Sequence, residues 1–112
     1  MEYKFRVKRL GKTTPVQVRF SRTDFPMNGN EDRQGATTCV LQISGGIYSG
    51  VALLHPNEED DIWIGMRRSY DRAVDAFVDA TQPPQRFKGE NIGLRRRAKT
   101  AMWRSFMGAY NG

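Results

Sequence analysis

The residues best suited to metal or acid–base chemistry are a histidine and an acidic run near the middle of the chain. His55 is followed by four consecutive carboxylates, Glu58 to Asp61, and carboxylates can hold Mg²⁺ together with substrate phosphates. Consecutive helical residues project in several directions, however, so they are poorly placed to surround one ion. Acidic residues also favour helix starts, where they complement the dipole and the free N–H groups. We therefore interpret the run as a helix start and expect no metal ion and no cofactor.

Nucleophilic chemistry has even less support. His55 is the only histidine, and the only cysteine, Cys39, lies within the apolar run TTCVLQI, where thiols are usually inert. The glycines of SGGIYSG lack the spacing of a phosphate-binding loop. One cysteine and one histidine exclude an internal disulfide and a structural zinc site, and a free thiol is typical of a reducing cytoplasm. We expect a binding protein without catalytic residues, not an enzyme.

Basic side chains, in contrast, are concentrated at both ends of the chain. The formal net charge is +6; residues 1–22 and 82–112 each carry +6, whereas residues 23–81 carry −6. The ends can form one positive surface that attracts a polyanion, or the acidic middle can neutralise them. Like charges opposite one another on a sheet face repel, and a bound phosphate backbone would relieve that repulsion. On an edge strand, the same charges would block pairing with another strand. The N-terminal cluster expected on such a face or edge contains Lys4, Arg6, Lys8, Arg19 and Arg22.

The second basic cluster lies in and before the last predicted helix, about residues 92–109, and large apolar residues accompany it. At 100° per residue, Trp103, Met107 and Tyr110 fall about 100° or more from the middle of the helix's apolar stripe, so at least one should stay partly exposed. Arginine beside aromatic residues suits single-stranded nucleic acid and protein interfaces, and a homodimer could cover the same residues. Alternatively, the cations pair with the acidic middle and the aromatic residues pack on the first helix or an N-terminal strand. The basic members are Arg86, Lys88, Arg95, Arg96, Arg97, Lys99 and Arg104.

Four strands are expected to precede the helices. Alternating apolar and polar residues predict strands at about 3–7 and 16–20, and two further strands are expected at about 37–43 and 47–54. The last two carry apolar residues on both faces, which favours central positions in the sheet. Residues 21–35 are typical of a long polar loop, with a turn at Asn28-Gly29.

The first helix is the clearest element of the sequence. Asn57 is suited to cap its start, with Asp60 at the third helical position, and Pro83-Pro84 ends it. Apolar residues fill one arc of about 160°, which predicts that this side faces the core. The residues near the centre of the arc are Met66, Tyr70, Ala73 and Phe77.

Residues 50–73, GVALLHPNEEDDIWIGMRRSYDRA, resemble a segment of small phage-encoded accessory proteins. In those proteins a strand with G-x-A leads to a proline, an acidic helix start, a helix glycine and a closing Arg-Ala. The resemblance implies a non-virion protein made inside an infected bacterium, acting on host machinery or defence. It implies no activity and no catalytic residue. The matching positions are Gly50, Ala52, Pro56, Asp60, Gly65, Arg72 and Ala73.

The sequence thus predicts a single α+β domain over residues 1–112: a four-stranded, mostly antiparallel sheet of two hairpins, followed by two helices packed on one face. No apolar run approaches the ~20 residues of a membrane span, so no membrane partner is expected. The predicted function is that of a small basic phage-type accessory protein in the host bacterial cytoplasm, which contacts nucleic acid or a host nucleoprotein through its C-terminal helix. The alternative is an inhibitor that binds a host enzyme or defence complex. The candidate binding residues are Arg95, Arg96, Arg97, Lys99, Trp103, Arg104, Met107, Tyr110, Lys4, Arg6 and Lys8.

Overall fold

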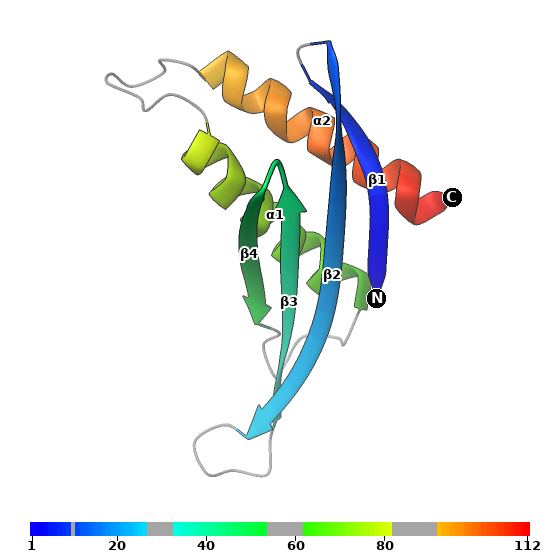
Figure 1. Ribbon diagram of the computed structural model, residues 1–112. Coiled ribbons are helices and arrows are strands. Elements are labelled where there is room, and N and C mark those ends of the chain that lie inside the picture. Colours follow the sequence, from blue (N-terminus) through cyan, green and yellow to red (C-terminus); the bar gives the residue numbers. More distant parts are fainter. Residues whose placement is uncertain (10, 27–32, 54–61, 82–91) are drawn as a thin grey trace.

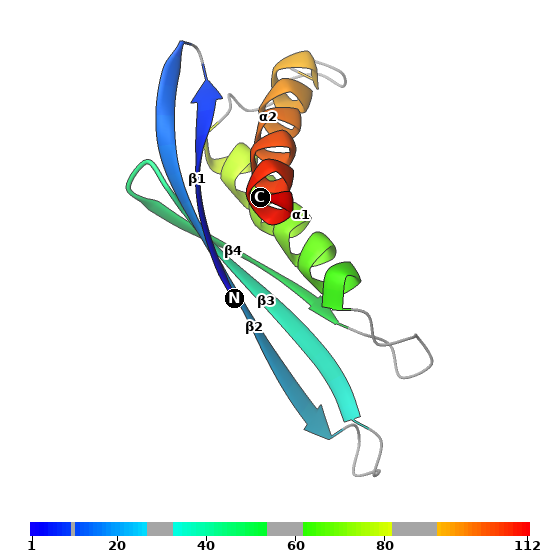
Figure 2. The same ribbon diagram turned by 90° about the vertical axis from the view of Figure 1, so that its right-hand side faces the viewer.

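Four antiparallel strands come first along the chain, and two helices follow them (Figure 1). The computed structural model describes residues 1–9, 11–26, 33–53, 62–81 and 92–112. The strands form one sheet in the order β1-β2-β3-β4. Both helices pack on the same face of the sheet and leave the other face open (Figure 2), so the predicted fold class is confirmed. The elements are β1 (Glu2–Arg9), β2 (Lys12–Pro26), β3 (Arg33–Ile43), β4 (Gly46–Leu53), α1 (Ile62–Thr81) and α2 (Ile92–Asn111).

Alternation along the strands decides which side chains reach the core. Val7 of β1 is buried beneath the helices, whereas Lys4, Arg6 and Lys8 are exposed on the open face. The same alternation continues across the sheet, because cross-strand partners share a face. The buried partners on the other strands are Val16, Val18 and Phe20 of β2 and Cys39, Leu41 and Ile43 of β3.

Two sequence-based expectations about the strands were wrong. Residues 21–35 do not form one long loop, because β2 continues to Pro26 and β3 begins at Arg33, and the two pair in register as far as Pro26↔Arg33. The predicted Asn28-Gly29 turn lies outside the described residues. β4 is an edge strand, not a central one; its outward apolar residues, among them Ile47 at 66% exposure, reflect an uncovered sheet face.

Helix α1 lies very close to β4, and glycine makes this approach possible. A Cβ atom on Gly50 would lie only 2.2 Å from the backbone oxygen of Ser69, and one on Gly65 would lie 2.4 Å from the Oγ1 of Thr37. Arg72 also donates to the backbone oxygen of Val51 on β4. Several positions of the phage-protein resemblance are thus explained by the packing of α1 on β3 and β4. The predicted core residues Met66, Tyr70, Ala73 and Phe77 are all buried, whereas Asn57, Asp60, Pro56 and Pro83-Pro84 lie outside the described residues.

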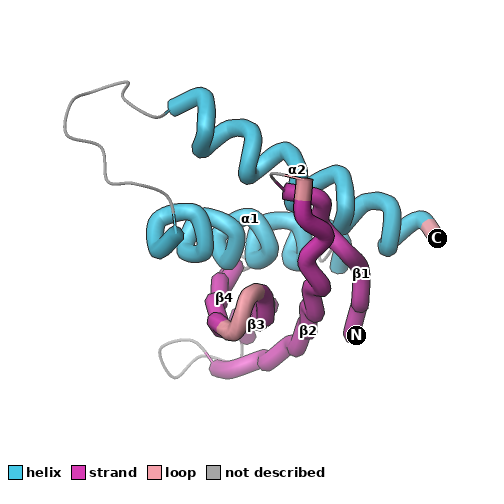
Figure 3. The backbone as a smooth tube through the Cα atoms, turned by 45° about the horizontal axis from the view of Figure 1, so that its top comes forward, coloured by secondary structure: helices cyan, strands magenta, loops and turns pink. Residues whose placement is uncertain are grey.

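Helix α2 runs antiparallel to α1 and is crossed by β1, as Figures 1 and 3 show. Its Phe106 is fully buried within an aromatic cluster, stacked on Tyr70 with ring centroids 4.4 Å apart and edge-on to Tyr3 at 5.6 Å. The Tyr70 hydroxyl donates to the Met102 backbone oxygen at 2.7 Å, which satisfies the one polar group that this tyrosine brings into the core. α2 therefore joins the C-terminus to both α1 and the N-terminal strand.

Candidate functional site

The two helices are joined by a ladder of polar contacts along their shared flank. On α1, Asp71, Asp75 and Asp79 recur every fourth residue, so they line one side of the helix. On α2, Arg95, Lys99 and Trp103 have the same spacing and meet them in antiparallel order. Arg95 pairs with Asp79, Lys99 pairs with Asp75, and the indole of Trp103 donates to Asp71.

Lys99 is the central member of this ladder. Its Nζ lies 2.7 Å from Asp75 Oδ1 and 3.8 Å from Asp71 Oδ1. The hydrogen bond to Asp75 raises the pKa of Lys99, and partial burial opposes that rise. The side chain is therefore held in its charged form between two aspartates. It is a cation that joins the helices and is not available to an external anion without breaking this contact.

The C-terminal basic cluster is consequently divided between two environments. Arg95 and Lys99 are neutralised by the acidic middle of the chain, which was the alternative left open by the sequence. Arg96, Arg97 and Arg104 are exposed on the outer side of α2, and none of the three forms an ion pair with another described residue. These three arginines form the α2 cationic surface.

The apolar residues of α2 that lie off its stripe are partly covered. Trp103 is half-buried and packs edge-on against Tyr70, with centroids 5.1 Å apart. Met107 is half-buried as well. Tyr110 is 39% exposed and packs on Trp63 at 4.6 Å, so one of the three is exposed, as expected. The sequence had left open that these residues pack on the first helix or an N-terminal strand. Such packing occurs because α2 has two neighbours, α1 and β1.

A groove of about 720 Å³ runs between the helices at this end. Trp103 and Met107 line it from α2, and Trp63, Ile64 and Arg67 line it from α1. The sequence did not reveal the α1 contribution, because Trp63 lies within the apolar arc of α1, the side of this helix that is expected to face the core. The spacing of Trp63, Arg67 and Asp71 at every fourth residue was the available signal for a shared flank.

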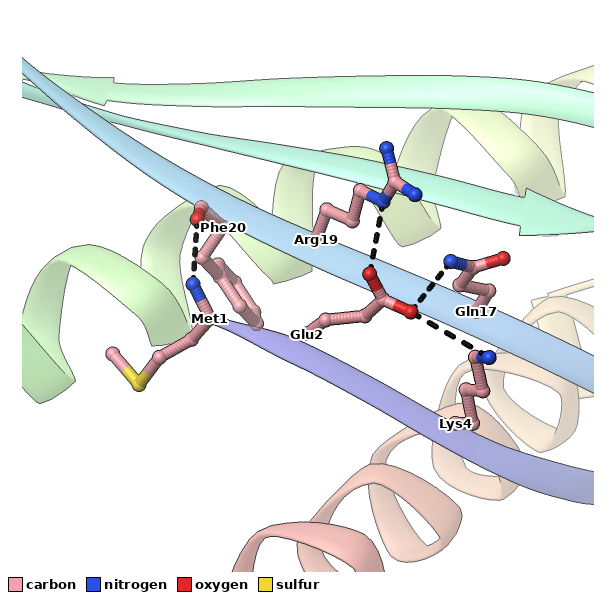
Figure 4. A network of polar contacts seen from close by, with 6 residues as sticks. All are labelled: Met1, Glu2, Lys4, Gln17, Arg19 and Phe20. Atoms are coloured by element: carbon pink, nitrogen blue, oxygen red, sulfur yellow. Dashed lines mark hydrogen bonds and ion pairs between the residues drawn. The ribbon is translucent and has the colours of Figure 1, made fainter.

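The open face of the sheet carries most of the N-terminal basic cluster, and Figure 4 shows two of its members, Lys4 and Arg19, beside Glu2. Lys4, Arg6, Lys8 and Arg19 are exposed there, as expected. Glu2 draws several of its neighbours together: it accepts from Gln17 Nε2 at 2.8 Å and from Arg19 Nε at 3.1 Å, and it lies 3.8 Å from Lys4 Nζ.

Arg22 differs from the other members of the N-terminal cluster. Its register partner is Thr37, which faces Gly65 of α1, so Arg22 belongs to the helix-facing side of the sheet. It pairs there with Asp24 at 3.5 Å. Arg86 and Lys88 lie outside the described residues.

The whole chain has eighteen Lys and Arg against twelve Asp and Glu, a net charge of +6. Five of these carboxylates have side chains of described placement, and each of the five is ion-paired: Glu2, Asp24, Asp71, Asp75 and Asp79. Exposed cations without an ion-pair partner among the described residues lie on β1 and on the outer side of α2.

The groups considered for catalysis are not assembled into a site by the described residues. Burial raises the pKa of the Cys39 thiol to about 12, so it stays protonated and unreactive at neutral pH. His55 and the run from Glu58 to Asp61 lie outside the described residues. Within the described ranges, no three His, Cys, Asp or Glu side chains are grouped so that they could hold a metal ion. Neither described helix has the length and apolar character that a membrane span requires.

Comparison of the chain with protein-family models, with curated proteins and with solved structures gave no match.

Proposed function

We propose that this protein binds nucleic acid through exposed cations on β1 and α2. The observation that carries the proposal is the exposure of Arg6, Arg96, Arg97 and Arg104 in a chain of net charge +6: none of these four arginines has an ion-pair partner among the described residues. The two elements that present these cations pack on each other through Tyr3 and Phe106. A polyanion would meet exposed positive charge on both elements. Nucleic acid is such a polyanion, because each of its nucleotides carries a charged phosphate.

The test is the salt dependence of binding. Each phosphate contact releases counterions, so binding weakens as salt rises. The magnitude of the slope of log K against log salt should decrease by about one unit for each contact removed. Arg97→Gln and Arg104→Gln should each lower the slope in this way. Arg67→Gln removes the same charge from an exposed residue of α1 and should leave the slope unchanged.

A second control uses an arginine that is already paired. The double change Arg95→Gln with Asp79→Asn removes one ion pair and keeps the net charge constant, so binding should stay as in the unmodified protein. No binding to DNA or RNA at low salt would refute the proposal, and so would tight binding with a flat salt dependence.

A second candidate function is protein binding in the groove between the helices. The groove brings Trp63, Trp103 and Met107 together beside Arg67, and tryptophan and arginine are enriched at interface hot spots. This candidate corresponds to the inhibitor of a host enzyme or defence complex. A pull-down from bacterial lysate, with and without nuclease, separates the two functions: a protein captured after nuclease treatment and lost with Met107→Glu would support the groove.

The bacterial host in both candidates derives from the resemblance of residues 50–73 to phage accessory proteins. In the structure, Gly50 and Arg72 of that segment make contacts between β4 and α1, and Gly65 lies against Thr37 of β3. The phage origin and the cytoplasmic site of action rest on that resemblance, and the partner captured in the pull-down tests the site of action.

A further inference from the structure

One straight row of side chains crosses the open face of the sheet from edge to edge. Lys4 is the register partner of Gln17, Gln17 of Gln42, and Gln42 of Ile47. Adjacent strands lie about 4.8 Å apart, so the row extends for about 14 Å. It therefore places a cation, two amides and an apolar side chain in a fixed order across the four strands.

The row forms the floor of a hollow of about 620 Å³. Arg6 and Pro15 border the hollow on the β1–β2 side, and the tight turn between β3 and β4 borders it on the other. That turn has two residues with positive φ, Ser44 at 52° and Gly45 at 76°, as a two-residue hairpin of this kind requires. The turn ends the β3–β4 pair while β1 and β2 continue past it, which leaves the hollow between them.

The chemistry of the row changes systematically along its length. At the β1 end, Arg6 has no ion-pair partner among the described residues, whereas Lys4, whose side chain is 73% exposed, lies 3.8 Å from Glu2 and must exchange that contact for a phosphate. In the middle, Glu2 holds the Gln17 amide by one hydrogen bond, whereas Gln42 is exposed and has no hydrogen-bond partner within the described part of the chain. At the β4 end, Ile47 presents an exposed apolar surface.

We propose that this hollow binds single-stranded nucleic acid, with the phosphate at Lys4 and Arg6 and the base over Gln42 and Ile47. This inference rests on the proposed function and gives it a substrate class. Arginine and lysine suit phosphate, an amide can donate to and accept from the edge of a base, and a branched apolar side chain contacts the face of a base. In a duplex, paired and stacked bases cannot reach the floor of the sheet, so only an unpaired strand uses the whole row.

The experiment measures the affinity of a fluorescent oligonucleotide of roughly 12 nucleotides, in DNA and in RNA form, single-stranded and as a duplex. The unmodified protein should prefer the single strand. Gln42→Ala should weaken single-strand binding by about three- to tenfold, the effect of one hydrogen bond, and leave duplex binding and the salt slope unchanged. Arg6→Gln should lower the salt slope by about one unit for either form.

Ser49→Ala is the matched control for Gln42→Ala. Ser49 is exposed on the same face but belongs to the next row, opposite Val40. Removal of its hydroxyl should therefore change neither the single-strand affinity nor the duplex affinity. Because both residues are exposed, the melting temperatures of both variants should equal that of the unmodified protein.

Equal affinity for single strand and duplex, with no effect of Gln42→Ala, would overturn this inference and leave the proposed function intact. Absence of binding to every oligonucleotide would refute both.

Discussion

The indole Nε1 of Trp103 donates a hydrogen bond to Asp71 Oδ1 at 3.3 Å, and Lys99 approaches the same carboxylate oxygen at 3.8 Å. One aspartate of α1 is thus shared by two residues of α2 that lie one turn apart. Because Trp103 also packs against the buried ring of Tyr70, it contributes to the fold as well as to the wall of the groove. Stability and binding are therefore coupled at this residue.

Trp103→Ala should lower the free energy of unfolding by about 2 kcal/mol, less than for a fully buried aromatic residue. The position of Trp103 away from the apolar stripe of the helix predicts an almost unchanged melting temperature, and the contact with Tyr70 is the reason to expect a loss of stability instead. Trp103→Phe keeps a ring but removes the N–H donor, so it should cost only about 1 kcal/mol. Urea unfolding of both variants measures the difference; two unaltered curves would show that the contact is not stabilising.

Phe77→Ala should destabilise the protein much more. The side chain is fully buried and lies edge-on to Tyr48 of β4 at 5.3 Å, so its removal leaves a cavity between helix and sheet. The expected cost is about 3 to 5 kcal/mol. Val51→Ala, at an exposed position of β4, is the comparison and should change stability by less than about 0.5 kcal/mol. Similar curves for the two variants would contradict the packing described here.

Two glycine substitutions should change the stability of the protein in opposite directions. Gly50→Ala would place a methyl group 2.2 Å from Ser69 O and 2.5 Å from Ala73 N; because both are backbone atoms, the helix must move, at a cost of about 1 to 3 kcal/mol. Gly108 lies within α2, and an added Cβ there meets nothing within 4 Å. Gly108→Ala should therefore stabilise the protein by about 0.5 to 1 kcal/mol. Thermal unfolding of the pair tests both expectations, and stabilisation by Gly50→Ala would refute the close approach.

Stability should fall at alkaline pH because of Cys39. Burial raises its pKa from an ordinary value of 9.0 to about 12, so below pH 9 the thiol is protonated in both states and contributes no pH dependence. Above pH 9 the unfolded chain loses this proton and the folded chain keeps it, so the free energy of unfolding decreases as pH rises. Burial also raises the pKa of Tyr70, which acts in the same direction at higher pH.

Urea unfolding between pH 8 and roughly pH 11 measures this decrease. Cys39→Ala should make the fall shallower over the first part of the range, whatever its effect on stability at pH 8. An identical slope in the variant and in the unmodified protein would show that the thiol does not titrate as expected.

The sequence was sufficient for α1 and for the first strand because each has one buried face with a clear period. Met66, Tyr70 and Phe77 recur at helical spacing and are buried, and the alternation of Lys4 and Arg6 with apolar residues marks β1. These signals are local, so no knowledge of the packing partners is needed to interpret them.

The surroundings of α2 could not be predicted in the same way. Trp103, Met107 and Tyr110 are covered by α1 and β1, which are distant in sequence, and the apolar stripe of α2 does not show that it has two neighbours. The division of the arginines has the same origin: whether Arg95 or Arg96 is neutralised depends on where Asp79 lies across the helix pair. The position of β4 at the edge was also hidden, because its apolar outer residues are typical of a central strand.

The bond from Arg72 to the Val51 backbone oxygen has a consequence for assembly. After the two-residue turn at Ser44-Gly45, Ile43 and Gly46 form the first paired residues of β3 and β4, and pairs that exchange backbone hydrogen bonds then alternate with pairs that do not. Val51 falls in the second set, so its carbonyl points outward, where another strand would add. Arg72 occupies that carbonyl and places a charge beside it, and both features oppose strand addition. At this point of the β4 edge, the contact therefore opposes the addition of a strand, which is the step that begins amyloid growth.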